Sequence, residues 1–580
     1  MGHDHTHHHG HDHEHGQARE HEHEHGQVES GSALDLSVPD AELAPPQRAR
    51  RSFLRNAGIL GAGVAGATVL PSGLEAAAAP VQGRRAQQAP RGGYTWLAGD
   101  HHIHTQFSPD AQYRVADQVK HAAAYGLDWM VITDHGTEAH AKIGVEKVNP
   151  EIRHARRGYD MLVFQGLEWN IPAAEHGTVF VHPGEHEVAV LKRFEQSFDG
   201  SVTGTSASSP ENETLALRGL DYLATVVERG RVEDALMLAN HPARKGIDSP
   251  HEIRGWRDRQ PRIAVGMEGA PGHQAASIPE PYGPGAGRGY YDNSPSADSF
   301  PGYPAESYVT WGGFDWMTAT VGGLWDSLLA EGRPWWITAN SDSHTVYREE
   351  SVRRPGADTS EYFNQYGQYG DPVHGSAGPQ LDNGDFWPGY YSRTHVGARQ
   401  DSYAAVMNGL RAGRVWVDHG SLLEGLDVRV RRAGSDGPGF PLGSAVDVKR
   451  GQRLELVISI DPATQPNWAQ FVPRLAKVDV IRGAVTGPVA DRDTFTTPDT
   501  RVVETYDVSG RRRRIDLTYP LGKAVEPFFV RLRGSDGKHT QPGFLGAAVD
   551  PAGPRIDPIG NSDPWRDLWF YTNPIWVLPS

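Results

Sequence analysis

The stretch Asp100-His101-His102-Ile103-His104-Thr105 (DHHIHT) closely follows a short apolar run, Trp96-Leu97-Ala98. Successive side chains of a strand point to opposite faces, so His102 and His104 point to the same side. Two imidazoles on one side of a strand end are typical of a metal site, but a single His-x-His pair is equally compatible with a structural role. The rest of the chain has to decide between these interpretations.

Other apolar runs in the chain also end close to a histidine or an acidic residue. The runs are residues 129–132 before Asp134 and His135, 161–164 before Glu168, 178–181 before His182, 235–238 before His241, 263–265 before Glu268, and 335–338 before Asp342 and His344. A helical pattern at 115–125 follows the first run. Buried strands separated by helices are typical of α/β proteins, in which the carboxyl ends of parallel strands share one face. We therefore expect these polar side chains to converge.

The composition restricts the chemistry of such a face. The chain has 580 residues, which predicts more than one domain, and it has 29 histidines and no cysteine. Thiolate metal sites, iron–sulfur clusters and cysteine nucleophiles are therefore excluded, and a metal would need His, Asp and Glu. The formal net charge of −16 provides no basic face for phosphate backbones, so we expect no nucleic-acid partner.

The complete set of motifs resembles the PHP (polymerase and histidinol phosphatase) family of metal-dependent hydrolases. The set comprises, in order, DHHIHT with Ser108-Pro109-Asp110, then TDHG, GLEW, EHGTVFVHP, NHP and SDSH, between about residues 96 and 344. The resemblance implies an α/β fold, a distorted (β/α)7 barrel, with a multinuclear metal site at the carboxyl ends of the strands.

The resemblance also implies a ligand set for two or three divalent ions, with Mn, Zn and Fe all compatible. The ligands are His102, His104, Asp110, His135, Glu168, His176, His241, Asp342 and His344. Glu168 would bridge two ions. His182, at the other end of the run that His176 begins, remains an alternative to His176.

Several neighbours of these motifs are candidates for supporting roles. Asp100 and Asp134 could orient ligand imidazoles or could cap turns. Lys142, Arg244 and Lys245 could hold a phosphate or could be solvated charges. Glu268 and His273 could line the pocket, or their Gly-rich segment could serve only as a turn.

The first 80 residues predict export. Residues 1–26 alternate His with Asp and Glu, a composition that predicts a disordered metal-chelating tract. Arg50-Arg51-Ser52-Phe53-Leu54-Arg55 then precedes an apolar Gly/Ala-rich run at 57–70 and resembles a twin-arginine (Tat) signal, with cleavage near residues 76–79. The run is too short to span a bilayer, which needs roughly 20 residues. We expect Tat-dependent export to the periplasm, cell wall or outside and no stable membrane span after cleavage; an uncleaved anchor is the alternative.

The pattern of apolar and polar residues divides the remaining chain into a linker and two predicted domains. A linker at 81–92 leads into the predicted PHP metallohydrolase domain at 93–419, which includes a long loop at 345–393. From about residue 420 the apolar residues alternate with polar ones between Gly, Pro and Asp turns, which predicts a β-sandwich at 420–580.

The function that these features predict is hydrolysis of a phosphate mono- or diester in a small molecule. The nucleophile would be metal-bound hydroxide, with no protein nucleophile. The alternative is a carboxyl-ester or carbamate hydrolase with the same site, because aromatic residues are frequent at 311–325 and 362–387 and the ending WFYTNPIWV resembles the carbaryl-hydrolase branch. A second alternative is a non-catalytic exported metal-binding protein.

Overall fold

The computed structural model describes residues 93–291, 294–538 and 563–580, which belong to one compact unit, Ala86–Ser580. The histidine-rich tract, the export signal and the linker predicted at 1–92 lie outside the described residues. Within the described ranges, no helix combines the length and the apolar character that a membrane crossing requires.

Strands β1 to β7 follow one another in chain order along part of a large mixed sheet. Their bounds are β1 (Thr95–Asp100), β2 (Trp129–Ile132), β3 (Leu162–Asn170), β4 (His176–Val181), β5 (Ala235–Ala239), β6 (Ala264–Ala270) and β7 (Trp336–Ala339). Each overlaps an apolar run of the sequence, and β2, β5, β6 and β7 are buried along their whole length. Continuous apolar runs form these strands because both faces of the sheet are covered.

One of these strands does not have the predicted direction. β4 runs antiparallel to both β3 and β5, whereas the pairs β1–β2, β2–β3, β5–β6 and β6–β7 are parallel. The expectation of uniformly parallel strands is therefore wrong at β4. Only residues 171–175 separate β3 from β4, too few for the crossover that a parallel pair needs. The reversal places the first residue of β4 beside the carboxyl ends of its neighbours.

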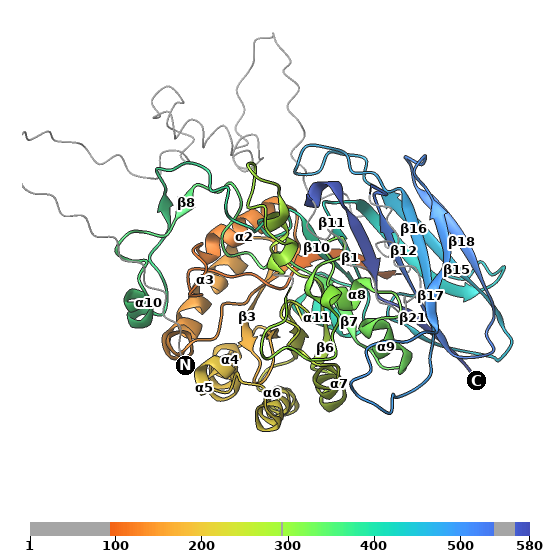
Figure 1. Ribbon diagram of the computed structural model, residues 1–580, viewed down its shortest axis with the longest axis horizontal. Coiled ribbons are helices and arrows are strands. Elements are labelled where there is room, and N and C mark those ends of the chain that lie inside the picture. Colours follow the sequence, from red (N-terminus) through yellow and green to blue (C-terminus); the bar gives the residue numbers. More distant parts are fainter. Residues whose placement is uncertain (1–92, 292–293, 539–562) are drawn as a thin grey trace, which may run out of the picture. The chain divides into compact units, whose positions relative to one another are not determined.

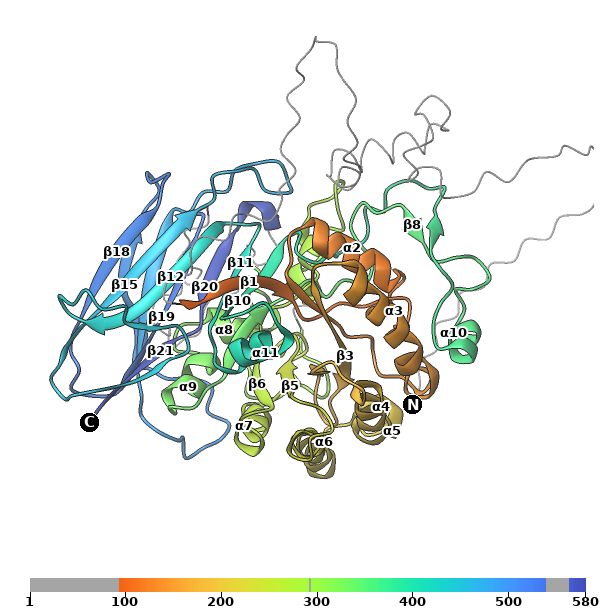
Figure 2. The ribbon, with the colours of Figure 1, turned by 180° about the vertical axis from the view of Figure 1, so that it is seen from behind.

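Helices cover the outside of this strand series (Figures 1 and 2). Their bounds are α2 (Val115–Ala124), α3 (Val145–Gly158), α4 (Glu187–Phe198), α5 (Gly200–Thr203), α6 (Pro210–Glu228), α7 (Pro250–Arg259), α8 (Trp316–Ala319), α9 (Leu324–Ala330) and α11 (Tyr403–Arg411). The predicted helix at 115–125 is α2, which buries Val115, Val119 and Ala122 against the core. The helical period places these three side chains on one face.

The strand series continues beyond β1 into the C-terminal part of the chain. β1 pairs antiparallel with β10 (Ser392–Ala398), β10 pairs with β11 (Val415–His419), and β11 pairs with β20 (Trp569–Thr572). Near the other end of the series, a single parallel bridge joins Ile103 to Ser343. The fold is thus mixed α/β with one large sheet, and closure into a (β/α)7 barrel stays a prediction.

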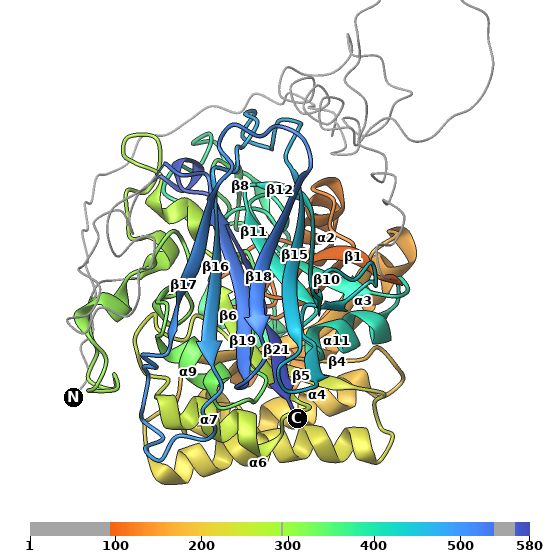
Figure 3. The same cartoon turned by 90° about the vertical axis from the view of Figure 1, so that its right-hand side faces the viewer.

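The C-terminal part consists almost entirely of strands (Figure 3). One sheet has the order β13-β12-β15-β18, and the large sheet contributes β14, β21, β19, β16 and β17. Their bounds are β12 (Leu423–Arg432), β13 (Phe440–Pro441), β14 (Ala445–Val448), β15 (Arg453–Pro462), β16 (Lys477–Ala484), β17 (Thr500–Asp507), β18 (Ile515–Lys523), β19 (Phe528–Ser535) and β21 (Ile575–Pro579). Residues of β15 alternate between buried and more exposed, so one face of its sheet packs on a core that includes residues of β19.

The segment predicted as a long loop at 345–393 has some structure of its own. It contains the paired strands β8 (Ser351–Val352) and β9 (Val373–His374) and the helix α10 (Ser360–Tyr366). The backbone N–H of Tyr347, near the start of the segment, donates to the carbonyl of Asp385, near its end. This hydrogen bond brings the two ends of the segment together.

Candidate metal centre

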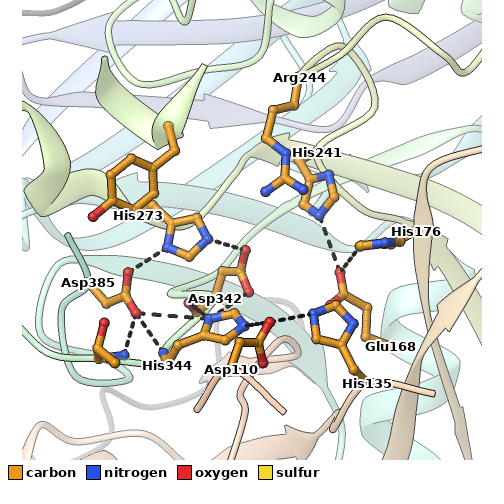
Figure 4. Close-up of a pocket in the computed structure, with 12 residues that line it drawn as sticks. Asp110, His135, Glu168, His176, His241, Arg244, His273, Asp342, His344 and Asp385 are labelled. Atoms are coloured by element: carbon orange, nitrogen blue, oxygen red, sulfur yellow. Dashed lines mark hydrogen bonds and ion pairs between the residues drawn. The ribbon is translucent and has the colours of Figure 1, made fainter. Parts of the chain in front are cut away.

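Seven of the nine predicted ligands line one cavity of about 350 Å³ (Figure 4), and the other two, His102 and His104, are buried beside it against Glu168 and Asp342. His102 and His104 follow β1, Asp110 lies further along the same loop, His135 follows β2, Glu168 lies in β3, His176 begins β4, His241 follows β5, and Asp342 and His344 follow β7. The carboxyl ends of most strands and the amino end of the reversed β4 therefore supply one site.

Several of these residues have unusual backbone conformations. The backbone angle φ is +30° at His241 and +46° at Asp342, values that residues other than glycine rarely adopt. A Cβ on Gly272 would lie 2.1 Å from the Cβ of Asp342, so only glycine permits the observed approach of these two segments. Such strain is concentrated at functional sites, where the surrounding structure maintains it.

The first group of side chains is His102, His104, Glu168 and Asp342, all buried. The Nε2 atoms of His102 and His104 lie 3.0 Å apart. Asp342 Oδ1 lies 3.0 and 3.2 Å from these two nitrogens, and the Glu168 oxygens lie 3.1 and 3.2 Å from them. Donor atoms of four side chains therefore face one point.

Two further groups share Glu168 with the first. On one side, His176 Nδ1 and His241 Nε2 lie 3.0 and 3.2 Å from Glu168 Oε1. On the other side, His135 Nδ1 lies 3.1 Å from Glu168 Oε2. The opposite nitrogen of His135 lies 3.0 Å from Asp110 Oδ2. The central carboxylate thus contacts every group, as a bridging ligand would.

The donor chemistry of the first group fits a divalent cation. Nδ1 of His102 lies 2.6 Å from a Glu268 oxygen and Nδ1 of His104 lies 3.1 Å from the Ser108 hydroxyl, so both rings can donate outward. In that tautomer both Nε2 atoms present lone pairs to each other and to two carboxylates. Ligands about 2.1 Å from one ion at right angles are about 3 Å apart, as these atoms are.

The charged side chains of the cluster shift the pKa values of their neighbours. Burial raises the pKa of Glu168, but His102 and His135 outweigh burial and hold that pKa well below its usual range. Burial lowers the pKa of His344, but Asp110 and Asp342 outweigh it and raise the value to about 10. Without a cation the carboxylates therefore retain protons on His135 and His344, whose pKa values are raised to about 9 and about 10.

His241 differs from this pattern. Burial and the nearby Arg244 charge lower the pKa of His241 to about 3, so its imidazole is neutral near pH 7. A neutral imidazole has a free lone pair and needs no deprotonation before it binds a cation.

The supporting acids have different roles. Glu268 contacts Nδ1 of His102 and accepts the backbone N–H of His241 at 2.7 Å, so it orients one ligand ring and the segment of another. Asp100 accepts the backbone N–H groups of His102 and Ser341, and Asp134 accepts the N–H and hydroxyl of Thr105. Only the bond of Asp100 to His102 is local, as in a turn cap, whereas the bonds to Ser341 and Thr105 join segments that are far apart in the sequence.

The structure separates the three cationic candidates. Arg244 lines the cavity, where its guanidinium lies 3.9 Å from Glu175. Lys245 is half exposed and lies 3.7 Å from the same carboxylate. Lys142 is exposed on the π-helix His140–Gly144, pairs with Glu138, and is not among the cavity-lining residues. Of the two interpretations of Lys142, its position matches the solvated charge, because the helix turns its side chain outward.

His182 is not brought to the cavity either. It follows the last residue of the antiparallel strand β4, so it lies at the opposite edge from His176, where its Nε2 is 3.5 Å from Glu233. The strand reversal selects His176 as the cavity residue.

Two further residues that can bind a metal line the cavity but were not among the predicted ligands. His273 was only a candidate for the pocket wall, and Asp385 was an unnamed part of the predicted loop at 345–393. The aromatic residues that suggested an ester or carbamate substrate do not line the cavity: Trp325 is in the core, and Trp387 stacks on His121. Tyr290 is the aromatic residue in the lining.

Comparisons with known proteins agree with a PHP domain. The PHP domain model matches residues 100–241, which includes His102 to His241 but not Asp342 or His344. No curated protein matches the sequence. Among solved structures, a two-domain Bacteroides vulgatus protein containing a predicted PHP-like metal-dependent phosphoesterase is 16% identical, with a TM-score of 0.29 over 78% of this chain and 95% of that one. A candidate metal-dependent phosphoesterase from Bifidobacterium adolescentis is also 16% identical, with a TM-score of 0.16 over 30% and 77%. Similarity at this level carries no argument about activity.

Proposed function

We propose that the chain is an exported, metal-dependent phosphoesterase that hydrolyses small phosphate mono- or diesters. The observation that carries the proposal is the clustering of nine nitrogen- and oxygen-donating side chains around the buried Glu168, seven of them in the cavity lining and two, His102 and His104, buried beside it. Three groups of donors share that carboxylate, which supports two or three divalent ions.

Bound divalent ions would acidify water, polarise the substrate oxygen and neutralise developing charge. The residues of the chain have defined parts in this arrangement. Glu268 fixes the ring of His102 so that its Nε2 points into the cavity. Arg244 lines the cavity, and its buried Nε has no hydrogen-bond partner among the described residues. A guanidinium with an unused donor is suited to the oxygens of a phosphate ester.

Export is a separate part of the proposal. It rests on the twin-arginine pattern at 50–55 and the apolar run that follows. The Tat route carries folded proteins, which is consistent with metal loading before export. Fractionation of cells with Arg50 and Arg51 both changed to Lys tests it: the variant should stay in the cytoplasm, and normal export of the variant would contradict Tat dependence.

The carboxyl-ester or carbamate alternative uses the same donors but has no need of Arg244. A panel of aryl phosphates and aryl carbamates, assayed with the manganese-loaded protein and with Arg244→Gln, distinguishes the two. We expect phosphate turnover, with kcat/KM reduced at least about 10-fold in the variant. Lys142→Gln is the control and should behave as wild type. Carbamate turnover that Arg244→Gln leaves unchanged would favour the alternative, and bound metal without any turnover would favour a non-catalytic metal-binding protein.

A further inference from the structure

His273 lies on the cavity wall outside the nine predicted ligands. It follows β6 closely, has φ +52°, and donates its backbone N–H to the carbonyl of Ser341 at 3.2 Å. Its side chain is 12% exposed, and that exposure is toward the cavity, whose wall it forms. The backbone therefore holds His273 against the segment that carries Asp342.

A carboxylate from the 345–393 segment fixes the orientation of the His273 ring. Asp385 Oδ1 lies 2.5 Å from Nδ1 of His273, and Oδ2 accepts the backbone N–H groups of His344 and Thr345 at 2.6 and 2.7 Å. Asp385 is buried. Because an ionised carboxylate only accepts hydrogen bonds, it places a proton on Nδ1 of His273.

The other nitrogen of His273 faces a second carboxylate. Nε2 lies 2.8 Å from Asp342 Oδ2. With the proton on Nδ1, a neutral ring would present its Nε2 lone pair to a lone pair of the carboxylate. Only a positive species between the two atoms, a proton or a metal ion, makes this approach favourable.

The same arrangement occurs at a predicted ligand on the other side of Asp342. His102 has Nδ1 at 2.6 Å from Glu268 and Nε2 at 3.0 Å from Asp342 Oδ1. Asp342 thus lies between two imidazoles, His102 and His273, and each has a buried carboxylate behind it. Carboxylates in that position orient metal-binding histidines and raise their affinity.

We propose that His273 is a further metal ligand, which binds a divalent cation through Nε2 together with Asp342 Oδ2, with Asp385 orienting its ring. Asp342 would then bridge two cations, as Glu168 would in the proposed function. This inference rests on the proposed function only in requiring that the cavity holds divalent cations.

The test compares manganese binding by wild type and His273→Asn, measured as ions per chain and as the dissociation constant of the weakest cavity ion. Asn tolerates the positive φ of this position, so the change removes the ligand and preserves the backbone. We expect one ion fewer per chain or at least about 10-fold weaker binding of one ion. Asp385→Asn should weaken the same ion by roughly 10- to 100-fold.

The matched control is His395→Asn, which removes a histidine that lies 2.9 Å from Asp418 outside the cavity. It should bind manganese as wild type does. All variants carry the same histidine-rich tract, so its contribution cancels. Unchanged stoichiometry and affinity in His273→Asn would overturn the inference while the proposed function stands.

Anomalous diffraction from manganese-loaded wild-type crystals tests the inference without a substitution. We expect a peak about 2.2 Å from both His273 Nε2 and Asp342 Oδ2. Peaks around Glu168 with none at His273 would refute this inference alone. No cavity peak at all would refute the proposed function as well.

Discussion

Two regions of the molecule bury many charges, but they pair them differently. Where α9 meets β19, Arg531 and Asp326 form a two-pronged ion pair at 2.8 Å, and both side chains are fully buried. In the cavity, buried carboxylates such as Glu168 face imidazoles instead. A guanidinium keeps its charge permanently, whereas an imidazole can exchange its proton for a metal ion. The comparison suggests that the first region maintains the fold and the second binds exchangeable cations.

The largest expected effect is the loss of turnover in Asp342→Asn. Asn keeps the shape and tolerates φ +46°, but it removes a charge shared by the first donor group and His273. We expect kcat/KM to fall at least about 10³-fold, in the range that removal of essential electrostatic groups produces. Steady-state kinetics measure this, and circular dichroism should show a native-like spectrum. Near-normal turnover would mean that Asp342 does not hold the catalytic metal.

Asp326→Asn is expected to lower the stability of the protein and to leave its turnover unchanged. The change leaves the Arg531 guanidinium buried without its charge partner, which costs about 3 to 5 kcal/mol of unfolding free energy. Denaturant unfolding measures the loss, while kcat per folded chain should stay normal. Glu526→Gln breaks the exposed pair with Arg450 and should cost less than about 1 kcal/mol. Equal losses in the two variants would remove the contrast between buried and exposed pairs.

Metal removal should destabilise the protein by a smaller amount. An ion present at 100 times its dissociation constant adds about 2.7 kcal/mol to the unfolding free energy. We expect chelation to lower the unfolding free energy of the wild type by about that amount. The loss on chelation should be smaller in Asp342→Asn, because this variant already lacks one ligand of the first donor group. Identical chelator effects on the two proteins would place the stabilising ions elsewhere.

The smallest expected effect is a dependence of metal affinity on pH. Asp110 raises the pKa of His135 to about 9 and that of His344 to about 10, in each case against the lowering effect of burial. Metal-free protein therefore holds these protons at pH 7, and a cation must displace them. Affinity should rise with pH up to about 10, with protons released on binding. Calorimetry in buffers of different ionisation enthalpy measures the release; no release at pH 7 would contradict the assigned protonation.

The same shifts act on stability without metal. Because the folded pKa of His135 is above its unfolded value near 6.5, its contribution is complete below pH 6.5 and is lost as the pH rises through about 9. Unfolding free energies of chelated protein between pH 6 and 10 should decline in that window.

Much of the strand framework was predictable from the sequence. Apolar runs ending near His135, Glu168 and His241 indicated buried strands, and β2, β3 and β5 form there. The motifs also identified residues that the fold brings together, because ligands follow the ends of strands. These patterns depend on local spacing, which the sequence displays directly.

The remainder depends on tertiary geometry. The connection at 171–175 is short only because β3 and β4 extend beyond the apolar runs 161–164 and 178–181, so the runs alone do not indicate the reversal of β4. That reversal separates His176 from His182. Asp385 has no motif around it, and only the folded 345–393 segment brings it to His273. Lys142 follows a ligand motif in sequence, but its helix turns it to solvent.

The most direct test of the central claim is the location of metal ions in manganese-saturated crystals by anomalous scattering. The account predicts two or three peaks inside the cavity, at least one within about 2.2 Å of Glu168 and the His102 and His104 nitrogens. Saturated crystals without any peak in the cavity would contradict it.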